Sequence, residues 1–102
     1  MILLHNRSLG LYLESQIEHL LYFPEGIECL LIGDVDTGKA ILRDYINATI
    51  GFDALGAVTA KSPKSLMRMF GPKGNPQARN IFEIIAHLQK KEGIQFKVQV
   101  VR

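Results

Sequence analysis

Four polar side chains between residues 61 and 68 have the types and the spacing to contact a polyanion. They recur at i, i+3, i+4 and i+7, which puts them on one face of a helix, and they are Lys61, Lys64, Ser65 and Arg68. The other side of that helix is apolar, and it carries Leu66, Met69 and Phe70. Two or three cations on such a face are by themselves better explained by solvation, so the surrounding elements must decide.

A second run, from Gly33 to Lys39, matches the G-x-x-x-x-G-K pattern of a phosphate-binding loop. The following residue is Ala40, so the hydroxyl that would bind magnesium is absent. Asp34 and Asp36 would also bring negative charge to a phosphate site. The pattern is better explained by a helix that stops at Gly33 and another that starts with a cap at Asp36 or Thr37.

No group of residues has the spacing of a catalytic or metal site. The three histidines are far apart in the sequence, at His5, His19 and His87. Glu14 and Glu18 form an i, i+4 pair that a solvated helix face explains, and no nucleophile lies near a matched base. We therefore expect no enzymatic activity, no cofactor and no metal.

The composition predicts one soluble domain. The chain has 102 residues, of which 47% are hydrophobic and 22% charged. No apolar run approaches the roughly 20 residues of a membrane span, and no secretion signal is evident at the start, so we expect no membrane partner and a cytoplasmic location. Cys29 is the lone cysteine and lies in an apolar run, which indicates a buried, reduced thiol.

The charge is divided unevenly between the two halves. Residues 1–50 carry three cations and seven acids, a net −4, whereas residues 51–102 carry nine cations and three acids, a net +6. The cationic helix face belongs to the positive half, which favours an anionic partner. An acidic half beside a basic half also leaves self-association open.

The hydrophobic periodicity is helical as far as residue 93 and predicts about six helices. The expected helices run from near Ser8 to a break at Pro24, from Ile27 to Leu31, from Asp36 to about Thr49, from Phe52 to Thr59, from Ser62 to Phe70, and from Pro76 to Gly93. In the last of these, Ile81, Ile84, Ile85 and Leu88 should face the core. Phe96, Val98 and Val100 then alternate with polar residues, which predicts a C-terminal strand. That strand would pair with Ile2 to Leu4 or with a second chain.

The helices over 52–59 and 62–70 have the length and the short connection of a helix-turn-helix. Ser62 can cap the second helix, Pro63 suits its first position, and Gly71 with Pro72 ends it. Gly56 is the small residue that would let the two helices approach closely. In this motif the second helix enters the major groove of DNA, although helical hairpins of this size also occur as plain scaffold.

From Asp34 to Val100 the chain resembles the addiction-module antidote family, small bacterial antitoxins with a lambda-repressor-like helix-turn-helix. The matching features are Gly51-Phe52, Leu55-Gly56, the Ser62 cap, the anchors Leu66 and Phe70, and Gly74-Asn75-Pro76 before a long helix. The resemblance implies an all-α fold with three parts: an N-terminal helical extension (1–34), a helix-turn-helix core (35–94) and the strand (95–102).

The resemblance also implies a function and assigns residues to it. The protein would be a nucleoid-associated repressor that binds double-stranded DNA as a homodimer, with the C-terminal strand as a candidate interface, and that neutralises a toxin protein. The residues expected to contact bases are Lys64, Ser65, Met67 and Arg68. Those expected to contact phosphates are Lys61, Ser62, Lys73 and Asn75.

Three residues depart from the family pattern. Ala60 replaces a glycine in the turn, Lys61 replaces an apolar residue, and Asp53 places a negative charge at the start of the first motif helix. These departures leave an alternative, in which the domain is a protein-interaction module that binds a partner toxin with weak or no DNA binding.

Overall fold

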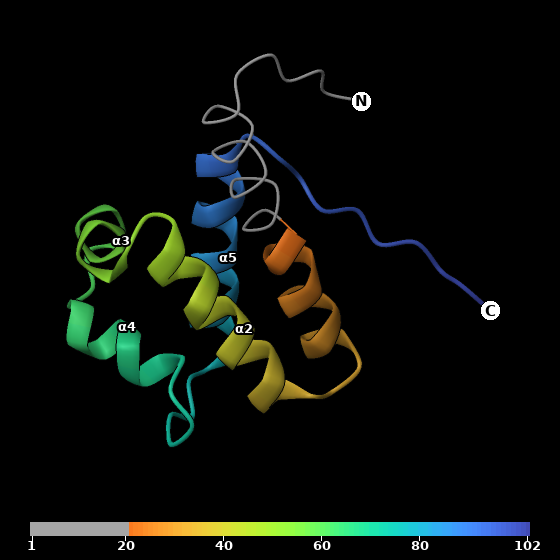
Figure 1. Cartoon of the computed structure of the whole chain (residues 1–102), viewed down its shortest axis with the longest axis horizontal. Helices are drawn as coiled ribbons and strands as arrows, with labels where there is room; N and C mark the ends of the chain where they lie inside the picture. The colour runs from red at the N-terminus through yellow and green to blue at the C-terminus, as the bar shows by residue number, and fades with distance from the viewer. Residues whose placement is uncertain (1–20) are drawn as a thin grey trace, which may run out of the picture.

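The protein is all-α in the part that the computed structural model describes, residues 21–102 (Figure 1). Residues 21–31 are helical, and four further helices follow: α2 (Val35–Ala48), α3 (Phe52–Thr59), α4 (Pro63–Met69) and α5 (Ala78–Glu92). Within this range no helix has both the length and the apolar character needed to cross a membrane.

Several expectations concern residues 1–20, which lie outside the described residues. They are the helix beginning near Ser8, the strand partner Ile2 to Leu4, the histidines His5 and His19, and the pair Glu14 and Glu18.

The prediction of six helices is wrong, because the expected break at Pro24 does not occur. Residues 21–31 are continuously helical, and Pro24 lies among them. Phe23 is completely buried, and Ile27 and Leu30 pack against the same core. These contacts recur at i, i+4 and i+7, so tertiary packing outweighs the local preference of proline. The described residues accordingly form five helices.

The predicted C-terminal strand is also wrong. Residues 94–102 have no regular secondary structure, since no second strand among the described residues offers a ladder of hydrogen bonds. Phe96 is held by other means: its amide donates to Gln89 Oε1 at 2.8 Å, and its ring meets that of Phe23 edge-on at 4.8 Å. Beyond Phe96 the chain leaves the body of the molecule, as the blue tail in Figure 1 shows.

Helix α2 begins earlier than expected, and its cap is Asp34 rather than Asp36 or Thr37. The Asp34 carboxylate accepts a hydrogen bond from the Thr37 amide at 3.4 Å. Lys39 lies inside this helix and is almost fully buried. Five of the seven residues from Gly33 to Lys39 are helical, so their amides do not form the loop that would surround a phosphate.

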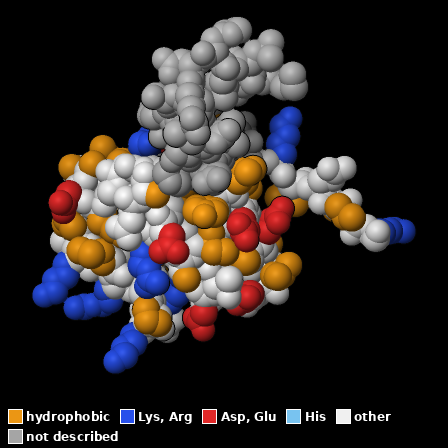
Figure 2. All heavy atoms as spheres, viewed as in Figure 1, with side chains coloured by type: hydrophobic (Ala, Val, Ile, Leu, Met, Phe, Trp, Pro, Cys, Tyr) orange, Lys and Arg blue, Asp and Glu red, His pale blue; other side chains and the backbone are white. Residues whose placement is uncertain are grey.

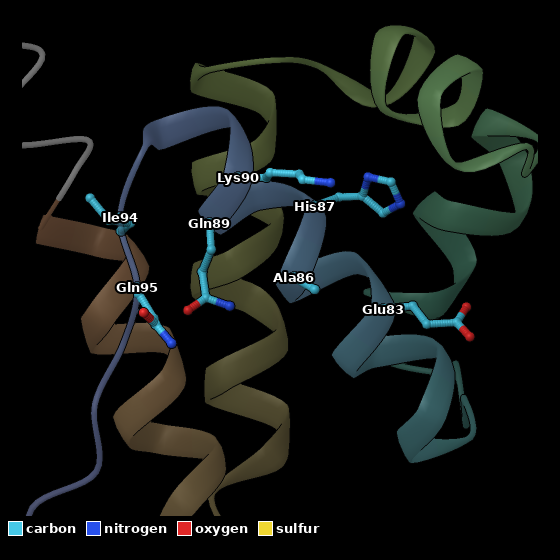
Figure 3. A pocket seen from close by; sticks show the side chains of 7 residues that line it. All are labelled: Glu83, Ala86, His87, Gln89, Lys90, Ile94 and Gln95. Atoms are coloured by element: carbon cyan, nitrogen blue, oxygen red, sulfur yellow. The ribbon is translucent and has the colours of Figure 1, made fainter.

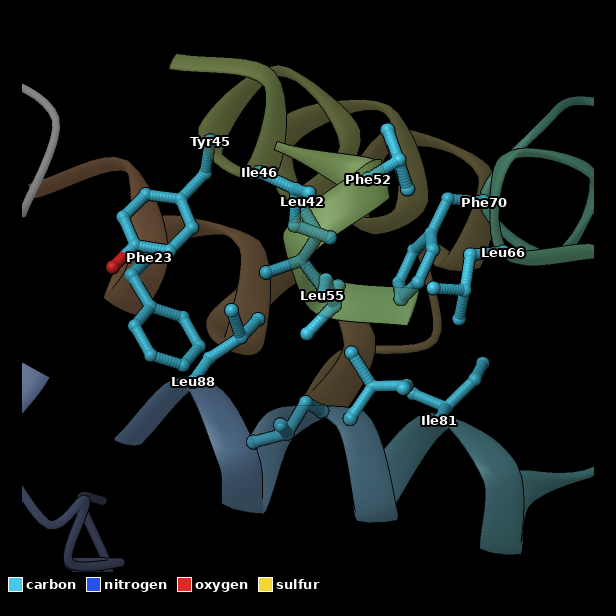
Figure 4. Close-up of a cluster of buried hydrophobic side chains, with 12 residues drawn as sticks. Phe23, Leu42, Tyr45, Ile46, Phe52, Leu55, Leu66, Phe70, Ile81 and Leu88 are labelled. Carbon is cyan, nitrogen blue, oxygen red and sulfur yellow. The ribbon is translucent and has the colours of Figure 1, made fainter. Parts of the chain in front are cut away.

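The core lies between α5 and the other helices, and its side chains are shown in Figure 4. It contains the four residues of α5 expected to face inward, which confirms that prediction: Ile81, Ile84, Ile85 and Leu88. At one end of the core, Phe23 stacks on Tyr45 with ring centroids 4.8 Å apart. The Tyr45 hydroxyl donates to Glu92 Oε1 at 2.5 Å. Burial, together with this carboxylate, raises the pKa of Tyr45 well above its usual range.

Candidate nucleic-acid interface

The connection between α3 and α4 is a tight turn of three residues, Ala60, Lys61 and Ser62. The Lys61 amide donates to the Gly56 carbonyl at 3.1 Å, and a Cβ at Gly56 would lie 2.6 Å from the Lys61 carbonyl oxygen. Gly56 is thus the small residue that allows the close approach, as predicted. The backbone of the connecting turn thus passes directly over α3 at this position.

Ala60 adopts the left-handed conformation that a glycine would normally supply. Its φ is 56° and its ψ is 36°, and it is the one described non-glycine residue with a positive φ. An alanine in this region costs about 1–2 kcal/mol because its Cβ crowds the following carbonyl. The turn therefore keeps its geometry despite the atypical residue, and the rest of the helix pair must offset the strain.

The inner side of α4 is fixed to α3 by apolar contacts. Leu66 and Phe70 are fully buried, and the Phe70 ring lies 6.4 Å from that of Phe52, centroid to centroid. Both predicted anchors of α4 are confirmed. Because this side is occupied, the orientation of the outer side of α4 is set by the core.

The N-terminus of α4 is capped as the sequence predicts. Ser62 Oγ accepts a hydrogen bond from the Ser65 amide at 3.0 Å, and Pro63 occupies the first helical position. A hydroxyl that accepts in this way still has its own proton to donate. Ser62 can therefore cap the helix and donate to a phosphate oxygen at the same time.

The outer side of α4 carries all four residues predicted to contact bases, and each is exposed: Lys64, Ser65, Met67 and Arg68. Of the residues predicted to contact phosphates, Ser62, Lys73 and Asn75 are exposed and Lys61 is half-buried. Among residues 21–102, the cations Lys64, Arg68 and Lys73 form no ion pair and no side-chain hydrogen bond. In Figure 2 Lys and Arg side chains project from the lower left of the molecule, on the side of α4.

A hollow of about 260 Å³ joins α4 to the loop that follows it. It brings together two predicted base contacts, Ser65 and Arg68, with two predicted phosphate contacts, Lys73 and Asn75. Lys61, Ser62, Lys64 and Met67 do not line it. Asn80, from the first turn of α5, does line it and was missed by the sequence reasoning. The only signal for Asn80 was a polar amide shortly after Asn75-Pro76 at the start of a long helix.

The loop after α4 is fastened to α2 by a buried cation. Lys39 Nζ donates to the Gly74 carbonyl at 2.8 Å, and only 3% of Lys39 is exposed. Gly74 also lies so close to α4 that a Cβ there would overlap the Arg68 carbonyl oxygen. Lys73 and Asn75 therefore flank a residue that is fixed on both sides. Sequence reasoning missed this role, because Lys39 and Gly74 are 35 positions apart.

A larger hollow, of about 520 Å³, lies along α5 and residues 94–95 (Figure 3). Two of its five polar side chains are engaged in the fold: Glu83 pairs with Arg79 at 3.2 Å, and Gln89 Oε1 accepts from the Phe96 amide. Among the described residues no group of three His, Cys, Asp or Glu side chains could hold a metal ion. The α4 side is therefore the better candidate for a functional site.

Comparisons of the chain with known protein families, with curated proteins and with solved structures find no match. The resemblance to the antidote family stays a prediction that rests on the motif residues named above.

Proposed function

We propose that the protein binds double-stranded DNA through α4 and regulates transcription. The observation that carries this proposal is the outer face of α4, where Lys64, Ser65 and Arg68 are exposed without ion pairs while Leu66 fixes the opposite side. A helix held in this way can enter the major groove and present its side chains to base edges. Arg68 would bind guanine O6 and N7, and Met67 would contact a thymine methyl group.

Residues at the two ends of α4 would contact the DNA backbone. Lys61 and Ser62 precede the helix, and Lys73 and Asn75 follow it, so phosphates on either side of the groove would have partners. Such contacts set the register rather than the sequence that is read. Each phosphate neutralised by a cation releases counterions, so the affinity should fall steeply as salt increases.

The biological setting of the proposal is an antitoxin-like autorepressor. We infer a homodimer that contacts two half-sites, acts in the bacterial cytoplasm at the nucleoid, and restrains a toxin protein. The exposed cations of α4 support the DNA-binding part. The dimer and the toxin rest on the resemblance alone.

A gel-shift experiment with the DNA upstream of the gene tests the proposal. Arg68→Ala and Lys64→Ala should each weaken specific binding by about 1–3 kcal/mol. Lys90→Ala is the matched control, because it removes an exposed cation at the far end of α5 and should bind like the parent. The proposal fails if no retardation appears at low salt, or if all three variants bind alike.

The alternative of a protein-interaction module is favoured by two observations. Asp53 is exposed in the first turn of α3, where it would repel DNA phosphates, and the apolar side chains of Val58 and Phe82 are exposed on α3 and α5. Co-purification with a neighbouring gene product, together with unchanged DNA mobility, would select this function. Sequence-specific footprints would exclude it as the sole role.

A further inference from the structure

The tail beyond Phe96 is apolar and cationic, and all of its residues, 97–102, are exposed. Val98, Val100 and Val101 are 84%, 86% and 84% exposed. They lie between Lys97 and Arg102, which are also exposed. Three neighbouring valines left in water are unfavourable, since each loses the burial that a core position would provide.

The turn between residues 21–31 and α2 has the opposite charge and the same apolar character. Leu31, Ile32 and Val35 are 65%, 80% and 45% exposed. We call this surface the acidic corner, and its other members are Glu25, Glu28, Asp34 and Asp36, all of them exposed. Figure 2 shows acidic and hydrophobic side chains mixed on the lower right of the molecule, opposite the cations of α4.

The carboxylates of the acidic corner surround the single cysteine. Cys29 is half-buried, and Glu25 and Ile32, at i−4 and i+3, share its helical face, while Glu28 directly precedes it in the sequence. Partial burial raises the pKa of the Cys29 thiol, and the charges of Asp34, Glu25 and Glu28 raise it further. Among residues 21–102, Glu25 and Glu28 form no ion pair. The corner therefore has negative charge available for a cationic partner.

We propose that residues 97–102 of one copy dock on the acidic corner of a second copy, and that the exchange is reciprocal. The valines of the tail would cover Leu31, Ile32 and Val35, while Lys97 and Arg102 would approach Glu25 and Glu28. Each chain thus carries both complementary surfaces, the tail and the acidic corner. Reciprocal exchange of the tails gives a closed twofold dimer.

The reach of the tail fits this arrangement. Each tail begins beside Phe23, where Phe96 is held, and the apolar part of the acidic corner begins at Leu31, the last residue of the same helix, about 12 Å away at 1.5 Å per residue. Six extended residues span about 20 Å. Two copies whose helical residues 21–31 lie side by side and antiparallel would therefore place each tail within reach of the partner's corner.

Site-directed cross-linking tests the contact directly. One chain carries Val100→Cys with Cys29→Ser, so its only thiol is at position 100. It is mixed with the parent chain, whose only thiol is Cys29. Oxidised glutathione is then added at mildly alkaline pH to form disulfides. A disulfide between position 100 of one chain and Cys29 of the other is the expected product. A disulfide only between two positions 100 would indicate tail-to-tail strand pairing and would overturn the proposal. Absence of any disulfide would also overturn the proposal. So would a disulfide that forms only within one chain when Val100→Cys is made in the parent chain, which keeps Cys29.

Charge reversal provides a second readout, measured by analytical ultracentrifugation at low salt. Glu25→Lys with Glu28→Lys should raise the dimer Kd about tenfold, because attractive contacts become repulsive. Adding Lys97→Glu and Arg102→Glu to the same chain should return the dimer Kd to the value of the parent, because the charges are again opposite. Asp44→Lys with Asp53→Lys is the control, since it changes the net charge equally at exposed sites on α2 and α3. A dimer that responds identically to both pairs of changes, or a monomer throughout, contradicts the proposal.

This inference rests on the homodimer proposed above but not on DNA binding. A failed gel-shift with an intact cross-link would remove the DNA-binding proposal alone. A failed cross-link with an intact gel-shift would remove the tail exchange alone.

Discussion

The two ends of the core are built in different ways. At one end α3 and α4 meet through a close backbone approach at Gly56, and the contacting residues 52–70 are neighbours in sequence. At the other end Phe23, Tyr45 and Phe96 form a ring cluster from segments up to 73 positions apart. Figure 4 shows Phe52, Leu66 and Phe70 together, with Phe23 and Tyr45 on the other side of the labelled cluster. At the first end an added methyl group at Gly56 would clash, whereas the second end depends on large side chains whose removal would leave a cavity.

The largest effect is expected from Phe23→Ala, which empties the centre of the aromatic end. Phe23 is fully buried and contacts the rings of both Tyr45 and Phe96. Replacing such a residue typically lowers the free energy of unfolding by about 3–5 kcal/mol. Urea denaturation measures this loss.

The same variant tests whether the two ends are independent. DNA retardation at a temperature where the variant is folded should be unchanged, since α4 is anchored elsewhere. A loss of retardation in the folded variant would show that the two ends are coupled.

Gly56→Ala should break the helix pair instead. The new methyl would meet the Lys61 carbonyl oxygen at 2.6 Å, and overpacking of this kind costs about 1–3 kcal/mol. Because α4 must move to relieve the contact, we expect weaker DNA binding as well as a lower melting temperature. Ala54→Gly is a useful comparison in the same helix, since that site is exposed. It should lower stability by about 1 kcal/mol through helix propensity and leave binding unchanged.

Tyr45→Phe should have a smaller effect that depends on pH. Losing the hydrogen bond to Glu92 costs about 1 kcal/mol at neutral pH. The pKa of Tyr45 is raised in the folded protein above the unfolded value of 10.0, so its stabilising effect is complete below pH 10 and declines as the pH rises further. The stability difference between parent and variant should therefore shrink above pH 10. Denaturation curves at pH 8 and above pH 10 measure it, and a constant difference would contradict the assignment.

Ala60→Gly should have the smallest effect, and it should be stabilising. Glycine removes a strain of about 1–2 kcal/mol at this left-handed position, but it adds about 0.4–1 kcal/mol of unfolded-state entropy. We expect a net gain of roughly 0.5–1 kcal/mol, visible as a small rise in melting temperature. A lower melting temperature would mean that Ala60 is not strained.

The predictions from sequence are correct where the contacts join sequence neighbours, and they fail where the contacts join distant segments. The cap at Ser62, the anchors Leu66 and Phe70, and the inward face of α5 were all predictable, because each depends on residues within a few positions of one another. The continuous helix through Pro24 was not, since it depends on the distant contact of Phe23 with Tyr45 and Phe96. Alternation at Phe96, Val98 and Val100 identified residues able to form a strand but not whether a partner strand exists.

The candidate site shows the same limit. Lys64, Ser65 and Arg68 could be chosen from helical spacing alone, and the structure leaves all three exposed. Asn80 and Lys39 could not be identified from the sequence. Asn80 lines the hollow from another helix, and Lys39 donates a hydrogen bond to Gly74, which is 35 positions away. Residues that act across the fold have no local signature.

The bond from Lys39 to Gly74 also bears on how quickly and how tightly the site can act. A free loop loses conformational entropy when it closes on a ligand, at about 1–2 kcal/mol for each residue ordered. Here Gly74 is fixed during folding, with Lys73 and Asn75 on either side of it. Binding at this surface would therefore proceed without a separate ordering step, and loosening the loop by Lys39→Met would appear mainly as faster dissociation.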